Sequence, residues 1–296
     1  MPAPPFEELL STAEEFLSRM ESEIEEGRHS NVPEFKRLGG VVIGSLPGSA
    51  VVTIVGDIHG DAETFHRILA ESGDSDLRVF LGDYVDRGPA EGQVSVIYTL
   101  MKRYLEGEPL VILRGNHEPP RSLVPYPHDF PRALRSLYGK EAGEVYDLLS
   151  KVWDLLPYTL IIKGRLLCMH GGPPTIRLED PLERYLGIED PDEAILEEIL
   201  WNDPTEDDVI RLPNPRGAGS LWGKRVTRIA LEKTGADMVI RGHEATMKGY
   251  KWNHEGRVLT LFSRLGAPYY NEMAAYLHCK LSEIRPGGEE CIITLD

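Results

Sequence analysis

The chain has 296 residues, of which 41% are hydrophobic, and its formal net charge at pH 7 is −16. This length allows one large buried core or two smaller ones, and no run approaches the roughly 20 apolar residues of a membrane-spanning helix. The acidic balance argues against general nucleic-acid binding, which requires a basic surface, and we interpret it mainly as a source of solubility.

The start of the chain and its cysteines predict a cytoplasmic protein. Residues 1–10 contain neither the basic segment nor the apolar segment of a secretory signal. Cys168, Cys279 and Cys291 are odd in number and far apart, and none belongs to a C-x-x-C pair. We therefore expect neither a disulfide framework nor a thiolate zinc site, and a reducing compartment follows as the default.

The first predicted element is an amphipathic helix over residues 6–27, where apolar residues such as Leu9 and Phe16 recur at helical spacing. We expect this helix to pack on the main domain. After it, short apolar runs alternate with helix-like stretches. The predicted strands cover 51–55, 77–81, 110–113, 166–169, 237–240 and 258–262, and the predicted helices cover 61–72, 90–105, 131–151, 191–200 and 220–234.

The end of the chain predicts a β-hairpin, with strands in 275–284 and 290–295 joined by a turn at Arg285-Pro286-Gly287-Gly288. Strands that alternate with helices predict an α/β fold. The sequence contains no internal repeat, low-complexity segment or linker. We therefore expect residues 1–296 to form a single domain.

Metal-competent side chains follow five of the predicted strands. They are Asp57 with His59, then Asp83, Asn116, His170 and His243. Each of them alone is typical of an ordinary turn or a satisfied polar residue, but the carboxyl ends of strands in an α/β sheet converge on one site. All six offer oxygen or nitrogen, which suits Mn, Fe or Zn, and six donors suit two ions about 3.5–4 Å apart that share a bridging carboxylate.

The other histidines lie off these strand ends, and we interpret them as surface or helix residues. They are His29, His66, His128, His254 and His278. The Pro-rich stretch 119–131 is expected to be rigid. It forms either one wall of the cleft or a plain surface loop.

Five short motifs resemble the signature of the metallophosphoesterases. They are GDIHG (56–60), GDYVDRG (82–88), RGNHE (114–118), MHGG (169–172) and RGH (241–243). With LWNDP (200–204), NPRGAG (214–219) and LFS (261–263), the chain resembles the phosphoprotein phosphatase family of serine/threonine phosphatases of the type-1/type-2A kind over about residues 50–280. The resemblance implies a four-layer α/β (α+β) metallophosphoesterase fold, with a central β-sandwich flanked by helices and a dinuclear metal site at the strand ends.

The resemblance also implies a division of the ligands between two divalent metal ions, with Mn expected in vitro and Fe or Zn as alternatives. Asp57 and His59 hold the first ion, Asp83 bridges, and Asn116, His170 and His243 hold the second. A hydroxide that bridges the ions then attacks the phosphate monoester directly, with no phospho-enzyme intermediate.

Other residues are expected to bind the substrate and to protonate its leaving group. Arg87 lies at the mouth of the expected site, where a guanidinium matches phosphate bidentately, and Arg216 resembles the family's second phosphate-binding arginine. His117 is the expected general acid, with Asp86 orienting its ring.

Asn116 and a tyrosine complete the expected phosphate-binding group. After LFS the text SRLGAPYYNEMAAY (263–276) departs from the family pattern because Arg264-Leu265-Gly266 intrude. We expect Tyr270 to be the tyrosine at the edge of the site, with Tyr269 as the alternative.

The expected activity is hydrolysis of phosphoserine or phosphothreonine in proteins or peptides, with no nucleic-acid or membrane partner; the sequence does not indicate regulatory subunits. The alternative enzyme is a dinucleoside polyphosphate hydrolase of the same superfamily. A non-catalytic phosphoprotein-binding scaffold is a third reading, which the intact ligand set disfavours. A P-loop or Rossmann protein is excluded because neither glycine motif is present.

Overall fold

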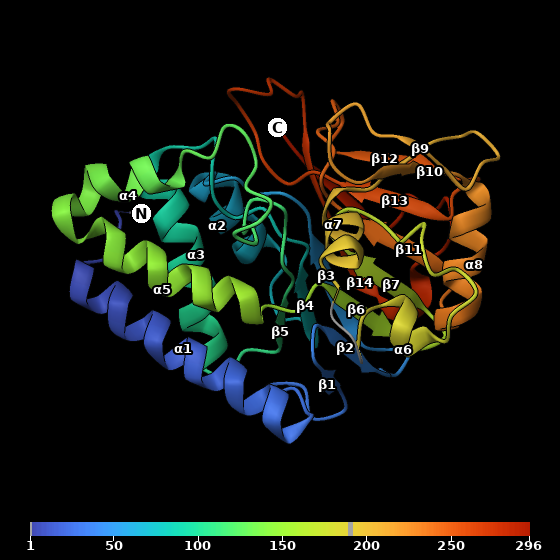
Figure 1. Ribbon diagram of the computed structural model, residues 1–296, viewed down its shortest axis with the longest axis horizontal. Helices are drawn as coiled ribbons and strands as arrows, with labels where there is room; N and C mark the ends of the chain where they lie inside the picture. Colours follow the sequence, from blue (N-terminus) through green and yellow to red (C-terminus); the bar gives the residue numbers. More distant parts are fainter. Residues whose placement is uncertain (1, 189–191) are drawn as a thin grey trace.

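Two β-sheets pack face to face at the centre of the computed structural model, and helices cover both outer faces (Figure 1). The structure describes residues 2–188 and 192–296. The strands are β1 (Lys36–Leu38), β2 (Val41–Gly44), β3 (Val51–Val55), β4 (Leu77–Phe80), β5 (Leu110–Ile112), β6 (Thr159–Ile162), β7 (Leu166–Met169), β8 (Asp203–Pro204), β9 (Arg211–Pro213), β10 (Ser220–Trp222), β11 (Met238–Arg241), β12 (Tyr250–Asn253), β13 (Val258–Leu261), β14 (Ala274–Lys280) and β15 (Ile292–Leu295). The α-helices are α1 (Phe6–Glu26), α2 (Ala62–Glu71), α3 (Ala90–Leu105), α4 (Phe130–Tyr138), α5 (Ala142–Leu155), α6 (Leu182–Tyr185), α7 (Glu193–Trp201) and α8 (Lys224–Thr234).

The order of the strands brings the predicted strand ends to one edge. One sheet has the order β15-β14-β3-β4-β5, and the other has the order β1-β2-β6-β7-β11-β13-β12. Strands β3, β4 and β5 run parallel, as do β7, β11 and β13. A parallel bridge between Asp57 and Phe262 joins the ends of the two sheets. The predicted four-layer α/β fold with a central sandwich is confirmed.

Side chains alternate along each central strand between two apolar layers. Val52 and Ile54 of β3 pack in the layer between the sheets, whereas Val55 packs under the helices α1 to α5. On the other sheet, Leu166 packs between the sheets and Leu167 packs under α7 and α8. This period of two is the expected geometry of a strand that is buried on both faces.

The predicted N-terminal helix is confirmed as α1, and it packs against α3 and α5. Its apolar stripe, which includes Leu9, Phe16 and Met20, is buried, and Gly27 ends the helix in the left-handed region at a φ of +66°. None of the helices in the described ranges is both long and apolar enough to cross a membrane.

Two predicted helices differ from the structure in their extent. The stretch 131–151 is two helices, α4 and α5, because Gly139–Glu141 forms a 3-10 turn between them. The stretch 220–234 begins with strand β10, and its helix starts only at Lys224. Residue 191, the predicted first residue of the helix 191–200, lies outside the described residues, and α7 begins at Glu193.

The expectation of unpaired cysteines is wrong. Cys279 and Cys291 form a disulfide, with 5.3 Å between their Cα atoms, and Cys168 is buried and free. The predicted closing hairpin is present as β14 and β15, but its strands are shorter than predicted, because β14 ends at Lys280 before a 3-10 turn at Leu281–Glu283 and β15 begins at Ile292. The hairpin places the two cysteines side by side although they are 12 residues apart. The cysteines therefore no longer support the expectation of a reducing compartment.

Candidate active site

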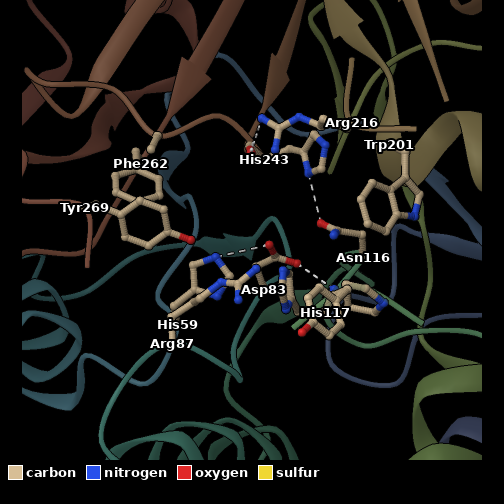
Figure 2. Close-up of a pocket in the computed structure, with 13 residues that line it drawn as sticks. His59, Asp83, Arg87, Asn116, His117, Trp201, Arg216, His243, Phe262 and Tyr269 are labelled. Atoms are coloured by element: carbon tan, nitrogen blue, oxygen red, sulfur yellow. Dashed lines mark hydrogen bonds and ion pairs between the residues drawn. The ribbon is translucent and has the colours of Figure 1, made fainter. Parts of the chain in front are cut away.

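The six predicted metal ligands converge where the strands of the two sheets end. Asp57 and His59 follow β3, Asp83 follows β4, and the other three follow β5, β7 and β11. All six side chains are at most 6% exposed, and Figure 2 shows His59, Asn116 and His243 gathered around Asp83. These six residues, called the metal-donor cluster below, are Asp57, His59, Asp83, Asn116, His170 and His243.

Asp83 lies between two groups of donors. On one side, Nε2 of His59 is 3.3 Å from Oδ2 of Asp83 and 3.9 Å from Oδ2 of Asp57. On the other side, Nε2 of His170 is 3.2 Å from Oδ1 of Asp83. The side-chain amide of Asn116 lies 2.9 Å from Nε2 of His170 and 2.9 Å from Nδ1 of His243. This is the geometry in which one carboxylate serves two neighbouring ions.

The protonation of two ring nitrogens shows that this donor set fits cations. Nδ1 of His59 donates to the carbonyl of Val85 at 2.9 Å, and Nδ1 of His170 donates to the carbonyl of Leu81 at 2.9 Å. Because a carbonyl oxygen only accepts, Nδ1 of each ring carries a proton, and in the neutral form of the ring Nε2 has a bare lone pair. Both lone pairs face the carboxylate of Asp83. Lone pairs that face each other in a buried site favour a positive ion between them.

The electrostatics of the site point the same way. Burial, reinforced by the charge of Asp83, raises the pKa of Asp57 to about 6. Burial also lowers the pKa of His59 to about 3, which keeps that ring neutral. In the described part of the chain, the ion-pair partners of Asp57 and Asp83 are histidines rather than lysine or arginine. Burial opposes protonation of His170, but the charge of Asp83 raises its pKa to about 8, so a proton on that ring offsets part of the buried negative charge. Bound cations would neutralise that charge in place of the proton.

The backbone is strained at the same positions. His59, Asp83, Asp86, Arg87 and His243 all have φ between +45° and +71°. This left-handed region is unfavourable for residues other than glycine and costs on the order of 1–3 kcal/mol each, so it persists where the surrounding fold enforces it. Such strain gathers at functional sites because it aims side chains that a relaxed backbone would direct elsewhere.

Glu118 and Gly242 allow the strained loops to lie close together. The buried carboxylate of Glu118 accepts the backbone N–H groups of Asp83 at 2.8 Å, Tyr84 at 2.9 Å and Gly115 at 3.1 Å. Gly242 precedes His243, and a Cβ atom at this position would lie 2.4 Å from Oδ1 of Asp57. Glycine is thus required there by the close approach of the two loops.

The contact predicted between His117 and Asp86, called the acid pair here, is present. Nδ1 of His117 lies 2.5 Å from Oδ2 of Asp86, and both side chains are buried. The backbone N–H of His117 donates to Oδ1 of Asp83 at 2.9 Å, which ties the pair to the metal-donor cluster. Burial opposes protonation of His117, but Asp83 and Asp86 together raise its pKa above the ordinary value. His117 is thereby suited to carry a proton to a substrate.

A pocket of about 300 Å³ opens above the donors (Figure 2). The arginines Arg87 and Arg216 both line it. Nε of Arg216 pairs with Oδ2 of Asp203 at 2.7 Å, and Nη1 of Arg87 donates to the carbonyl of Pro127 at 3.0 Å. The pocket has further lining residues to which the sequence analysis gave no individual role, and these are Pro125, Tyr126, Trp201, Ala245 and Phe262.

The preference for Tyr270 over Tyr269 is wrong. Tyr269 lines the pocket and stacks on His59 with 5.7 Å between ring centroids, whereas Tyr270 is 75% exposed. The intruding Arg264 is buried beneath this turn, donates to the carbonyl of Ala267, and places its guanidinium 5.3 Å from the ring of Tyr269. Figure 2 shows the Tyr269 hydroxyl directed toward the centre of the site.

The interpretation of the remaining histidines is also partly wrong. His29 and His254 are each 3% exposed. His128 is half-buried as a residue, but its side chain is only 7% exposed and lies against the acid pair, with Nδ1 2.7 Å from Oδ2 of Asp86. The Pro-rich stretch that carries His128 is a wall of the pocket rather than a plain surface loop, because Pro125 and Tyr126 line it. No local spacing in the sequence marks His128, since it reaches Asp86 only through this fold.

The fold and the buried donor set define a metal-dependent phosphoesterase. Residues 50–247 match the family model described as calcineurin-like phosphoesterase. The chain belongs to this family.

Solved structures of phosphatases share the fold at low sequence identity. A protein serine/threonine phosphatase from Saccharomyces cerevisiae with similarity to human phosphatase PP5 is 20% identical, with a TM-score of 0.72 over 97% of this chain and 89% of that one. A cold-active protein-tyrosine phosphatase of a psychrophile, Shewanella sp., is 18% identical, with a TM-score of 0.53 over 91% of this chain and 85% of that one. These likenesses establish the fold and leave the substrate open.

Proposed function

We propose that the chain is a serine/threonine phosphoprotein phosphatase, in which residues 1–296 form one catalytic domain. The observation that carries the proposal is the contact between His117 and Asp86 beside the metal-donor cluster. A serine or threonine alkoxide is a poor leaving group, and it leaves readily only if it is protonated as the bond to phosphorus breaks. A buried imidazole that a carboxylate orients at the floor of the pocket supplies that proton.

Each ligand has a place in this proposal. Asp57 and His59 would hold one divalent ion, Asp83 would be shared, and the other three donors would hold the second ion, as their grouping on the two sides of Asp83 suggests. When bound, such ions supply Lewis-acid activation of water and of the phosphoryl oxygens. The oxygen and nitrogen donors suit Mn, Fe or Zn.

The remaining pocket residues bind and orient the phosphate. Arg87 and Arg216 present guanidinium groups to the pocket, and their planar forks match the phosphate oxygens. The amide of Asn116 and the hydroxyl of Tyr269 contribute neutral hydrogen bonds. Held in this way, the ester oxygen of the substrate faces Nε2 of His117, the ring nitrogen that Asp86 leaves free.

The rim of the pocket favours a peptide rather than a small phosphate ester. The large hydrophobic side chains that are exposed in the described ranges are Val124, Tyr126, Met247 and Tyr270. All of them lie on the loops that carry Asn116 and His117, His243, or Tyr269. Of these side chains Tyr126 lines the pocket, and exposed apolar side chains on the loops that carry the site suit a phosphorylated residue that is flanked by further residues.

A comparison of substrates tests the proposal. The purified protein, reconstituted with Mn²⁺, is assayed with phosphoserine, phosphothreonine and phosphotyrosine peptides of one sequence and with a dinucleoside polyphosphate. We expect kcat/KM to be highest for the phosphoserine or phosphothreonine peptide. Preferred cleavage of the dinucleoside polyphosphate, or of the phosphotyrosine peptide, contradicts the assignment and identifies the alternative.

Truncating Tyr126 is expected to weaken peptide binding. Its side chain is 97% exposed at the mouth of the pocket, and loss of an aromatic contact costs about 1 kcal/mol, or roughly fivefold in KM. The Tyr126→Ala variant should raise KM for a phosphopeptide by about that factor and affect p-nitrophenyl phosphate much less. Tyr98→Ala, at a partly buried tyrosine of helix α3 outside the pocket lining, is the control. Equal effects of Tyr126→Ala on the two substrates contradict a peptide-binding rim.

A further inference from the structure

Asp86, the partner of His117, has a second histidine bound to it. Nδ1 of His128 lies 2.7 Å from Oδ2 of Asp86, the same oxygen that Nδ1 of His117 contacts at 2.5 Å. The other oxygen, Oδ1, accepts the backbone N–H groups of Asp129 at 2.8 Å and of Phe130 at 2.7 Å. Four donors thus occupy the roughly four acceptor positions of one carboxylate, and two of them are histidines.

The second histidine is itself oriented from its far side. Nε2 of His128 lies 3.0 Å from the hydroxyl of Tyr146 on α5. A carboxylate only accepts, so Nδ1 of His128 carries the proton that it donates to Asp86. In the neutral ring Nε2 then accepts from the Tyr146 hydroxyl. The contacts form one chain in which Tyr146 donates to His128 and His128 donates to Asp86.

This series of hydrogen bonds from Tyr146 through His128 fixes the position of Oδ2 of Asp86. The two backbone donors hold only Oδ1, so they do not by themselves fix the position of Oδ2. His128 holds Oδ2 where it meets His117, and its side chain is only 7% exposed, so it also keeps water from that oxygen. The ring of His117 can then present Nε2 to the pocket in a single orientation.

We propose that His128 is a positioning residue for the general acid, acting on His117 through Asp86. The proposal rests on the proposed function, in which His117 protonates the leaving group. It makes the segment Pro127–Phe130 part of the catalytic machinery, although His128 does not line the pocket. The segment also accepts from Arg87 through the Pro127 carbonyl and the Asp129 carboxylate, so it supports both the acid and a phosphate-binding arginine.

The dependence of kcat on the leaving group separates this role from a structural one. A general acid matters little for p-nitrophenyl phosphate, whose leaving group is a weak base. It matters more for phenyl phosphate, whose leaving group has a pKa of about 10 like a tyrosine side chain, and most for a phosphoserine peptide. A change that only loosens the fold lowers kcat for all three substrates alike.

Two amide variants of His128 form a matched pair. In His128→Gln the amide nitrogen replaces Nε2 and the donor to Asp86 is lost, whereas in His128→Asn the amide nitrogen replaces Nδ1 and the donor is kept. General acid catalysis contributes a factor of about 10²–10⁴ to the rate, and His128 affects only the orientation of the acid. We therefore expect His128→Gln to lower kcat about tenfold for the phosphoserine peptide. The loss should be about threefold for phenyl phosphate and less than twofold for p-nitrophenyl phosphate. His128→Asn should restore most of it.

A double-mutant cycle completes the test. In a His117→Asn background the acid is absent, so adding His128→Gln should cause no further loss with any substrate. His254→Gln, at another buried histidine that contacts Thr205 and Thr227, should leave the dependence on the leaving group as in the parent protein. Equal losses on all three substrates, or a further loss in the His117→Asn background, overturn the proposal. If the aryl phosphates show the expected pattern but phosphoserine peptides are not cleaved, the role of His128 stands and the serine/threonine assignment falls.

Discussion

Replacing His117 with asparagine is expected to lower kcat for a phosphoserine peptide by about 10²–10⁴, which is the usual contribution of a general acid. The metal content should stay unchanged, because the tie between residue 117 and Asp83 is made by the backbone N–H and not by the ring. The measurements are kcat with the peptide and elemental analysis of the same preparation.

The loss caused by His117→Asn should shrink for p-nitrophenyl phosphate, which needs little help from an acid. An unchanged kcat with the phosphoserine peptide excludes His117 as the acid. A loss of metal together with activity would instead assign the ring to the metal-donor cluster, because His117 offers a ring nitrogen within 4.8 Å of donor atoms of His59 and Asp83.

Replacing Asp83 with asparagine is expected to have a still larger effect. Asp83 faces both His59 and His170, so the substitution removes a charged oxygen from both groups of donors at once. We expect bound metal to fall from two ions to one or none per chain and kcat to fall by at least about 10³, since Lewis-acid activation and its alignment are lost together.

Elemental analysis and kcat at saturating Mn²⁺ check this prediction for Asp83. Asp74→Asn, an exposed carboxylate distant from the strand ends, is the matched control and should retain both ions. Full metal content and activity in Asp83→Asn contradict a shared carboxylate.

The metal-donor cluster could be predicted because its signal is local. Each ligand follows a short apolar run, as Asp83 follows β4, and the convergence of strand ends is a general property of such sheets. The main strands and α1 could be predicted for the same reason, since the pattern of apolar residues that marks them lies within a short segment of sequence.

The features that sequence reasoning missed depend on contacts between distant segments. His128 reaches Asp86 across 42 positions, and nothing next to it in the sequence marks this contact. Tyr269 rather than Tyr270 enters the pocket, where its ring stacks on His59 from a distant segment of the chain. The pairing of Cys279 with Cys291 could have been found, because the predicted hairpin already brought its two strands together.

Titration of the metal-free protein with Mn²⁺ tests the central claim that two ions are held where the strand ends meet. Bound metal per chain and phosphatase activity are followed in the same samples. We predict saturation at two ions per chain, with activity that is absent in the metal-free protein and is restored as the second ion binds. Saturation at one ion or none, or full activity in the metal-free protein, would contradict the claim.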